Sequence, residues 1–181
     1  FEKNKHFLGF DTLQRAVITA VKEAVDNSLD ACEEARILPT IKVEINKLKG
    51  DKLELICQDN GPGIPRDSVE HVFGKFLLGS RFHAIRQTRG QQGIGITGVV
   101  MYSQLTTGSK THVISKIKSD SSAVHVDLGL DTRKNKATKS NEIRDVWFED
   151  GEEVVNGLKI KTVMKAKYQR GRQSVHQYLR M

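Results

Sequence analysis

The sequence lacks the features that would place it in a secreted, metal-binding or membrane-spanning class. It has only two cysteines, Cys32 and Cys57, and neither lies near other residues at metal-ligand spacing. We therefore expect two buried, reduced thiols rather than a disulfide framework or a zinc site. No apolar run approaches the roughly 20 residues that a membrane-spanning helix needs, and no signal-peptide pattern is present. These absences predict a cytoplasmic protein with no membrane partner.

The residues that are present are those of an ordinary globular domain. Of the 181 residues, 38% are hydrophobic and 28% are charged, which is enough apolar material for a core. We therefore expect one soluble domain that spans residues 1–181. Because the sequence opens at Phe1 without an initiator methionine, we interpret it as a fragment of a longer protein. The net charge of +7 favours a polyanionic neighbour such as nucleic acid without establishing one.

The order of apolar and polar residues predicts a mixture of helices and strands. Apolar residues recur at helical spacing over 11–36, where Asp11 can cap the helix and Pro39 marks its end. Alternating segments at 41–47 and 53–59 flank a turn and predict a β-hairpin. We also expect helices at 68–76, 96–104 and 172–180, a mobile connection at 78–92, and strands at 112–118, 123–130, 146–149 and 158–164. The mixture predicts an α+β fold, in which a mostly antiparallel sheet carries helices on one face.

A stripe of polar residues runs along the first predicted helix. Its members share one helical face, at i, i+3, i+4 and i+7: Glu23, Asp26, Asn27 and Asp30. Acids without a lysine or arginine on that face repel one another unless a cation lies there. Such oxygen ligands suit Mg²⁺, and a nearby glutamate can deprotonate an attacking water. Taken alone, the stripe also fits the solvated face of an amphipathic helix.

The second predicted strand ends on a carboxylate that faces the core. Side chains alternate along a strand, so Asp59 shares a face with Leu53, Leu55 and Cys57. A carboxylate in that direction is costly unless donors meet it, and the amino group of an adenine is one candidate. The glycines that follow, up to Gly63, would let backbone approach a flat ring. An aspartate that caps an Asn-Gly turn is the alternative interpretation.

Glycines precede the helix predicted near residue 96. Backbone N–H groups at a helix N-terminus bind phosphate, and the glycines of 90–95 would permit close approach. The run is no Walker loop, because no Gly-Lys-Ser/Thr follows. It is also a poor dinucleotide fingerprint, because the preceding segment is rich in arginine. A flexible hinge is the alternative, and a phosphate-binding lid also needs a hinge.

Together these three segments resemble the ATP-binding motifs of the GHKL ATPase superfamily. Glu23–Ala31 resembles the first motif, Asp59–Ile64 the second, and Gly90–Gly95 the lid. The superfamily includes gyrase-type topoisomerases, heat-shock chaperones, mismatch-repair ATPases and histidine kinases. The resemblance implies the Bergerat ATP-binding fold, with ATP and Mg²⁺ as cofactors.

Longer strings are similar to the B subunits of type VI DNA topoisomerases, at 73–83, 91–96, 102–108 and 170–175. This resemblance implies that ATP closes a homodimer of B subunits, which drives passage of one DNA duplex through another while a partner A subunit cuts DNA. The alternatives are a nucleotide-gated dimerisation module or another GHKL ATPase of the gyrase, mismatch-repair or chaperone type. The intact Glu23 argues against a module without hydrolysis. A basic DNA-binding module would not explain the acidic stripe.

The resemblance also implies a role for each matching residue. Glu23 would be the general base that activates water, Asn27 would hold Mg²⁺, and Asp59 would accept the adenine amino group. The other implied nucleotide contacts are Gly63 beside the base, Ser80 and Arg81 before the lid, and a run around the phosphates: Gly90, Gln91, Gln92, Gly93, Ile94, Gly95, Ile96 and Thr97.

Two differences from the family pattern limit these expectations. The family usually carries a Gly-Thr pair where this sequence has Gly157-Leu158, so the contact expected from a threonine hydroxyl is in doubt. The lysine that reaches the γ-phosphate belongs to a later transducer domain in the family, outside these residues. We therefore expect this chain to bind ATP and to hydrolyse it slowly by itself.

A basic stretch lies between two predicted strands and includes Arg133, Lys134, Lys136, Lys139 and Arg144. It fits either a solvated loop or a contact with DNA phosphates. Strongly salt-dependent DNA binding, weakened when these residues are neutralised, would favour the second interpretation.

Overall fold

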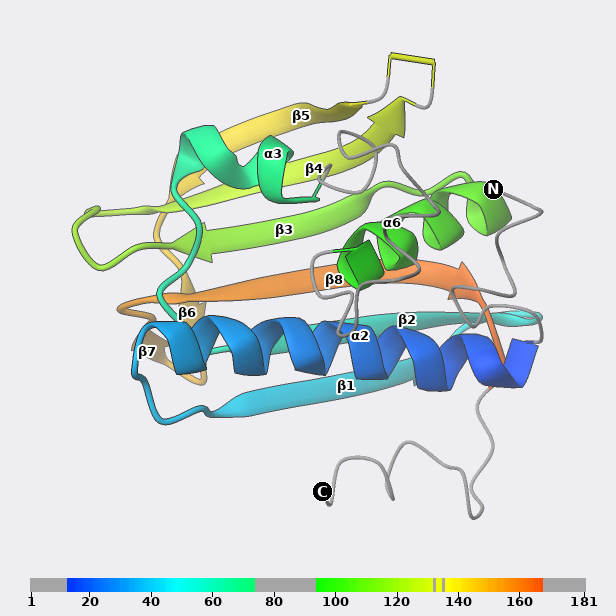
Figure 1. Ribbon diagram of the computed structural model, residues 1–181, viewed down its shortest axis with the longest axis horizontal. Coiled ribbons are helices and arrows are strands. Elements are labelled where there is room, and N and C mark those ends of the chain that lie inside the picture. The colour runs from blue at the N-terminus through cyan, green and yellow to red at the C-terminus, as the bar shows by residue number, and fades with distance from the viewer. Residues whose placement is uncertain (1–12, 74–93, 132, 135, 168–181) are drawn as a thin grey trace.

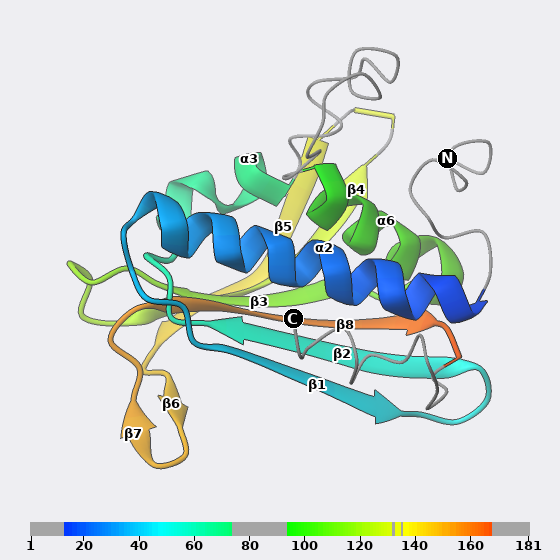
Figure 2. The same cartoon turned by 60° about the horizontal axis from the view of Figure 1, so that its bottom comes forward.

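The protein is a two-layer α+β sandwich, seen in a computed structural model that describes residues 13–73, 94–131, 133–134 and 136–167 (Figures 1 and 2). The main sheet contains β1 (Ile41–Lys47), β2 (Lys52–Asp59), β3 (Thr111–Lys116), β4 (Ala123–Asp131), β5 (Lys136–Asp145) and β8 (Gly157–Lys165). Its strand order is β1-β2-β8-β3-β4-β5, and neighbouring strands are antiparallel. The helices α2 (Leu13–Glu34), α3 (Val69–Phe73) and α6 (Ile94–Thr107) cover one face of this sheet, as Figure 2 shows. The predicted fold class is confirmed.

The core lies between the helices and the sheet. Small and β-branched residues such as Ala16, Val17, Ala20 and Val21 bury one side of α2 against the sheet and α6. Helix α6 is apolar around most of its surface, because it contacts α2 on one side and β8 and β4 beneath it. The two helices begin and end within a few residues of their predicted limits, while Asp11 lies outside the described residues.

The β1–β2 hairpin confirms the two alternating segments of the sequence. Ile41 pairs with Asp59 and Lys47 pairs with Leu53, so Ile41, Val43 and Ile45 lie on the same side of the hairpin as Leu53, Leu55 and Cys57, towards the helices. The next neighbour of β2 is β8, where Leu158 pairs with Asp59. The end of β2 therefore lies inside the sheet, beside a strand about a hundred residues later in the sequence.

Strand β5 corrects the prediction of a basic loop at this place. It pairs with β4 along its length except at an irregularity that leaves Asn141 and Glu142 without partners in the ladder, and Ala137 is its only buried residue. Because β5 is an edge strand, it contacts little of the core and has no apolar alternation for sequence analysis to detect. Lys139 forms ion pairs with Glu70 and Glu142, and Arg144 pairs with Asp120.

Those ion pairs divide the basic stretch. Arg133, Lys134 and Lys136 are exposed near the turn between β4 and β5, so they are the members of the stretch that could meet a polyanion. Whether they contact DNA stays a prediction.

The strand predicted at 146–149 is also different from expectation. Only Phe148 and Glu149 are extended, as strand β6 (Phe148–Glu149), and they pair with β7 (Glu152–Glu153) in a separate two-stranded hairpin. This hairpin projects from the face of the sheet that carries no helix (Figure 2). Trp147 is buried beside it and donates its indole N–H to Glu149, while Val146 and Phe148 are exposed.

Other predictions fall outside the described residues, namely the mobile connection at 78–92 and the helix at 172–180. Within the described ranges, no helix is both long enough and apolar enough to cross a bilayer.

Replacing Gly157 by alanine should destabilise the fold. Gly157 has φ of +151°, and an added Cβ would lie 2.3 Å from the carbonyl oxygen of Asp59. We expect Gly157→Ala to lower the free energy of unfolding by about 2 kcal/mol or more, since backbone must shift. Urea denaturation would measure this loss. Gly129→Ala is the matched control, because its Cβ would meet only ordinary contacts at 3.4 Å or more, and equal losses in the two variants would contradict the argument.

Candidate functional site

A cavity of about 420 Å³ opens where the C-terminal half of α2 meets the loop after β2. It draws its walls from α2, from the 59–64 segment, from α3 and from the start of β8. Its lining residues are Asn27, Ala31, Glu34, Ala35, Asp59, Pro62, Gly63, Ile64, Val72 and Leu158. The first two predicted segments therefore meet at one cavity, which is apolar over much of its wall and is also lined by two carboxylate residues, Glu34 and Asp59, and by the amide residue Asn27.

Asp59 is the buried carboxylate of this cavity. The side chain faces the helices as predicted and is 4% exposed. Its Oδ2 accepts a hydrogen bond from Ser28 Oγ at 2.6 Å, and its Oδ1 accepts one from the Gly61 N–H at 2.9 Å. Burial raises the pKa of Asp59, while the hydrogen bonds from Ser28, Gly61 and Leu158 oppose that rise. The turn-capping alternative is thus partly correct, because Asp59 caps Gly61 and also lines the cavity.

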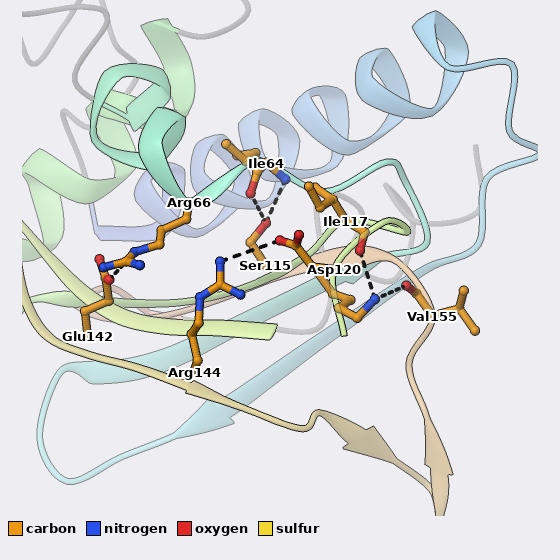
Figure 3. A network of polar contacts seen from close by, with 9 residues as sticks. Ile64, Arg66, Ser115, Ile117, Asp120, Glu142, Arg144 and Val155 are labelled. Carbon is orange, nitrogen blue, oxygen red and sulfur yellow. Dashed lines mark hydrogen bonds and ion pairs between the residues drawn. The ribbon is translucent and has the colours of Figure 1, made fainter. Parts of the chain in front are cut away.

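The loop that follows Asp59 is held from several sides. Asn156 donates its side-chain amide to the carbonyls of Asn60 and Gly61. Ser115 Oγ exchanges hydrogen bonds with Ile64, accepting from its N–H and donating to its carbonyl, both at 2.7 Å (Figure 3). These bonds come from β3 and from the segment before β8, so contacts within the protein hold this wall of the cavity in place.

Gly63 occupies a position that only glycine fits. It has φ of +75°, and a Cβ would lie 2.2 Å from the carbonyl oxygen of Lys116. The loop therefore passes directly over the end of β3, where the Lys116 ammonium donates to the carbonyls of Ile117 and Val155. Gly63 lines the cavity, and its place beside a base stays a prediction.

Glu23 lies against the N-terminus of α6. A Cβ added to Gly95 would fall 1.7 Å from Glu23 Oε2, so the glycine makes room for the carboxylate. Burial raises the pKa of Glu23, and Lys22 and Asp26 shift it in opposite directions. A raised pKa suits a residue that must take up a proton near neutral pH. The first and third predicted segments are thus in direct contact.

The N-terminus of α6 presents backbone N–H groups that have no acceptor within the helix. Gly95 and Ile96 belong to this first turn and are buried, and Ile94 opens it. Thr97 is fully buried, and its hydroxyl donates to the carbonyl of Phe73 at 2.6 Å. The hydroxyl therefore ties α6 to α3, and a phosphate contact at Thr97 stays a prediction. Ser80, Arg81, Gly90, Gln91, Gln92 and Gly93 lie outside the described residues.

The side-chain oxygen of Asn27 could serve as a ligand of Mg²⁺, which prefers oxygen and takes most of its ligands from phosphates and water. Asn27 is partly exposed and lines the cavity, one helical turn from Glu23. The described residues contain no cluster of three or more His, Cys, Asp or Glu that could hold a metal ion. A metal ligand at Asn27 stays a prediction.

The acidic stripe on α2 is partly neutralised, contrary to the expectation of acids without a balancing cation. Lys22 pairs with Asp26 at 2.9 Å, so a cation from outside the stripe neutralises one of its acids. Asp30 remains among acids, and its pKa is raised by burial first and then by Asp26, Glu33 and Glu34. Lys22 lies four residues before Asp26, a helical spacing at which two side chains can interact, and it was not counted with the stripe.

Ser28 is the residue that sequence reasoning missed. It is buried, and its hydroxyl contacts Asp59 at the cavity. A signal was present in the sequence, because Ser28 is polar while its neighbours at i−4 and i+4, Ala24 and Cys32, are apolar and buried. A lone serine on the buried side of a helix indicates a specific hydrogen-bond partner.

Comparison with known proteins finds relatives that are similar to this chain over almost its whole length. The chain is 51% identical over 181 residues to the B subunit of the type 2 DNA topoisomerase 6 of Archaeoglobus fulgidus, covering 99% of this chain and 29% of that protein. It is 49% identical over 182 residues to the B subunit of the same enzyme from Methanosarcina acetivorans, covering 99% and 28%. The chain therefore spans less than a third of the length of these relatives.

A solved structure and a family model agree on the fold. The 43K ATPase domain of Thermus thermophilus gyrase B, solved in complex with an aminocoumarin, has a TM-score of 0.50 and 15% sequence identity, covering 89% of this chain and 37% of that chain. The model of the histidine kinase-, DNA gyrase B- and HSP90-like ATPases matches residues 12–134. Since that match covers more than half of the chain, the chain belongs to this ATPase family.

Proposed function

We propose that the cavity between α2 and the 59–64 loop binds ATP and that Glu23 catalyses its hydrolysis. The observation that carries this proposal is the meeting of three separated segments. Asn27 on α2 and Asp59 at the end of β2 line one cavity. Glu23, which is also on α2, lies against Gly95 at the start of α6. The buried carboxylate offers an acceptor to an adenine amino group, and the N–H groups that open α6 offer donors to phosphates.

Each described residue has a distinct task in this proposal. Asp59 orients the base, and Gly63 and Leu158 form walls beside it. Asn27 holds Mg²⁺, which would neutralise phosphate charge when bound. Glu23, half-buried and next to the first turn of α6, orients the attacking water and takes its proton. Ser80, Arg81 and Gly90–Gly93 complete the nucleotide contacts in the same proposal.

We infer that the domain comprises residues 1–181 and drives a type VI DNA topoisomerase as part of its B subunit. The named relatives support this assignment. ATP would close a homodimer of B subunits, and closure would accompany passage of a DNA duplex cut by an A subunit. The cytoplasm would be the site of action. A nucleotide-gated dimerisation module is the second candidate, and it is distinguished from the first by the absence of hydrolysis.

Two substitutions should separate binding from hydrolysis. Asp59→Asn removes the charged acceptor, so we expect ATP affinity to fall by about 10- to 100-fold or more. Glu23→Gln should leave ATP binding intact and lower the hydrolysis rate by about 10²- to 10⁴-fold, because the general base is lost. Calorimetry with ATP and Mg²⁺, and a phosphate-release assay, measure the two effects. If wild-type chain takes up no ATP at millimolar concentration, the proposed function is wrong.

A methyl group at Gly95 should displace the carboxylate of Glu23, the proposed general base, without blocking the part of the cavity proposed to hold adenine. Gly95→Ala places Cβ where Glu23 Oε2 lies, so we expect hydrolysis to fall by about 100-fold while ATP still binds. Adding Glu23→Asp to Gly95→Ala shortens the acid and should recover part of the lost rate. Wild-type hydrolysis by Gly95→Ala would show that Glu23 does not act from this position.

The isolated chain should bind ATP and hydrolyse it slowly, with a rate per chain that rises with protein concentration. The reason is that closure of two copies contributes to catalysis in the proposed mechanism, and dilute chains meet rarely. Sedimentation with and without a non-hydrolysable ATP analogue would show whether the nucleotide promotes dimers. Fast turnover that is independent of protein concentration would contradict this prediction.

A further inference from the structure

Ser28 is the one hydroxyl in a row of small residues along the sheet-facing side of α2. The row repeats every fourth residue, and each member is at most 4% exposed: Ala16, Ala20, Ala24, Ser28 and Cys32. Because these side chains are short, the helix backbone lies close to the sheet. That closeness lets a side chain as short as serine reach Asp59 Oδ2 at 2.6 Å.

The hydrogen bonds around Asp59 leave a defined part of its carboxylate for a ligand. An ionised carboxylate only accepts hydrogen bonds, at about four lone-pair positions. Ser28 Oγ occupies one position on Oδ2, the Gly61 N–H occupies one on Oδ1, and the backbone N–H of Leu158 donates to the same carboxylate. Asp59 is also a lining residue of the cavity. The carboxylate is thus held from the helix, the loop and β8, and an acceptor position remains for a ligand in the cavity.

The neighbouring strand does not supply an equivalent donor side chain. Leu158 pairs with Asp59 across the β2–β8 ladder and lines the cavity, but its side chain cannot form a hydrogen bond. Among the residues that the structure describes, Ser28 is the only side chain that donates to Asp59. Its bond is short, as expected when the acceptor is charged. Ser28 is therefore the side-chain donor that acts beside the backbone N–H groups of Gly61 and Leu158 to orient this buried carboxylate.

We propose that Ser28 is a positioning residue for base recognition, whose hydroxyl holds Asp59 as a directed acceptor and thereby selects purines with an amino group at position 6 over those with an oxo group. This inference rests on the proposed binding of ATP in the cavity. A 6-oxo base presents an acceptor to the fixed carboxylate, and two acceptors repel each other. When the hydroxyl is removed, the carboxylate loses a donor that opposes the rise in its pKa, so it can rotate or take up a proton and discriminate less.

Calorimetry with two probes, ATP and inosine triphosphate, tests the proposal on this chain. We expect Ser28→Ala to weaken ATP binding by on the order of tenfold, and to lower the preference for ATP over inosine triphosphate by a similar factor. Ser28→Thr keeps the hydroxyl and should restore most of the preference. Ser103→Ala is the matched control. It removes a buried helical hydroxyl that bonds to the Val163 carbonyl, outside the residues that line the cavity, and should leave the preference unchanged.

The outcomes separate this inference from the proposed function. If wild-type chain binds neither triphosphate, both are overturned. If it prefers ATP and Ser28→Ala keeps the same preference, only the role of Ser28 is overturned. Should Ser28→Ala fail to fold by circular dichroism, Ser28→Cys replaces it, since a thiol of similar size is a weak donor. An unchanged preference in Ser28→Cys would then overturn the inference, and a lowered one would support it.

Discussion

The buried carboxylate of Asp59 is the constraint on which the site depends. A charge at this depth is unfavourable unless donors surround it, and here the donors come from three different elements. Ser28 on α2, Gly61 in the following loop and Leu158 on β8 each act on it. The carboxylate thus ties the first long helix to the centre of the sheet, at the place where the cavity opens.

The close approach of backbone segments follows from that arrangement. Gly157 lies against the Asp59 carbonyl, Gly63 against the Lys116 carbonyl, and Gly95 against Glu23. Each of these glycines stands where a side chain would push two elements apart. The cavity is therefore built by backbone as much as by side chains, and the hydrogen bonds of Asn156 and Ser115 keep the loop in place. Such a preorganised wall lowers the cost of ordering a bound nucleotide.

Strong local patterns in the sequence predicted much of the fold. The helical spacing before residue 36 and the alternation before Asp59 correctly predicted α2, β1 and β2. Strand β5 could not be predicted, because an edge strand that buries only Ala137 has no apolar pattern. The strand predicted at 146–149 is shorter than expected, because only Phe148 and Glu149 pair, with a hairpin partner outside the main sheet. In the site, the row of small residues on α2 that contains Ser28 can be seen in the sequence. Its hydrogen-bond partner Asp59 cannot be assigned in the same way, because it lies 31 residues away in the chain.

The sequence by itself determined which chemical groups this chain can use and where its regular elements fall. Helical and strand periods are local, so Glu23 and Asn27 were placed on one helix face and Asp59 on the core side of a strand without any structure. Tertiary structure alone decided that Gly95 receives Glu23, that Leu158 pairs with Asp59, and that Ser28 holds its carboxylate. These contacts join residues far apart in the chain, and their distances depend on how closely the helices pack on the sheet, which no local pattern encodes.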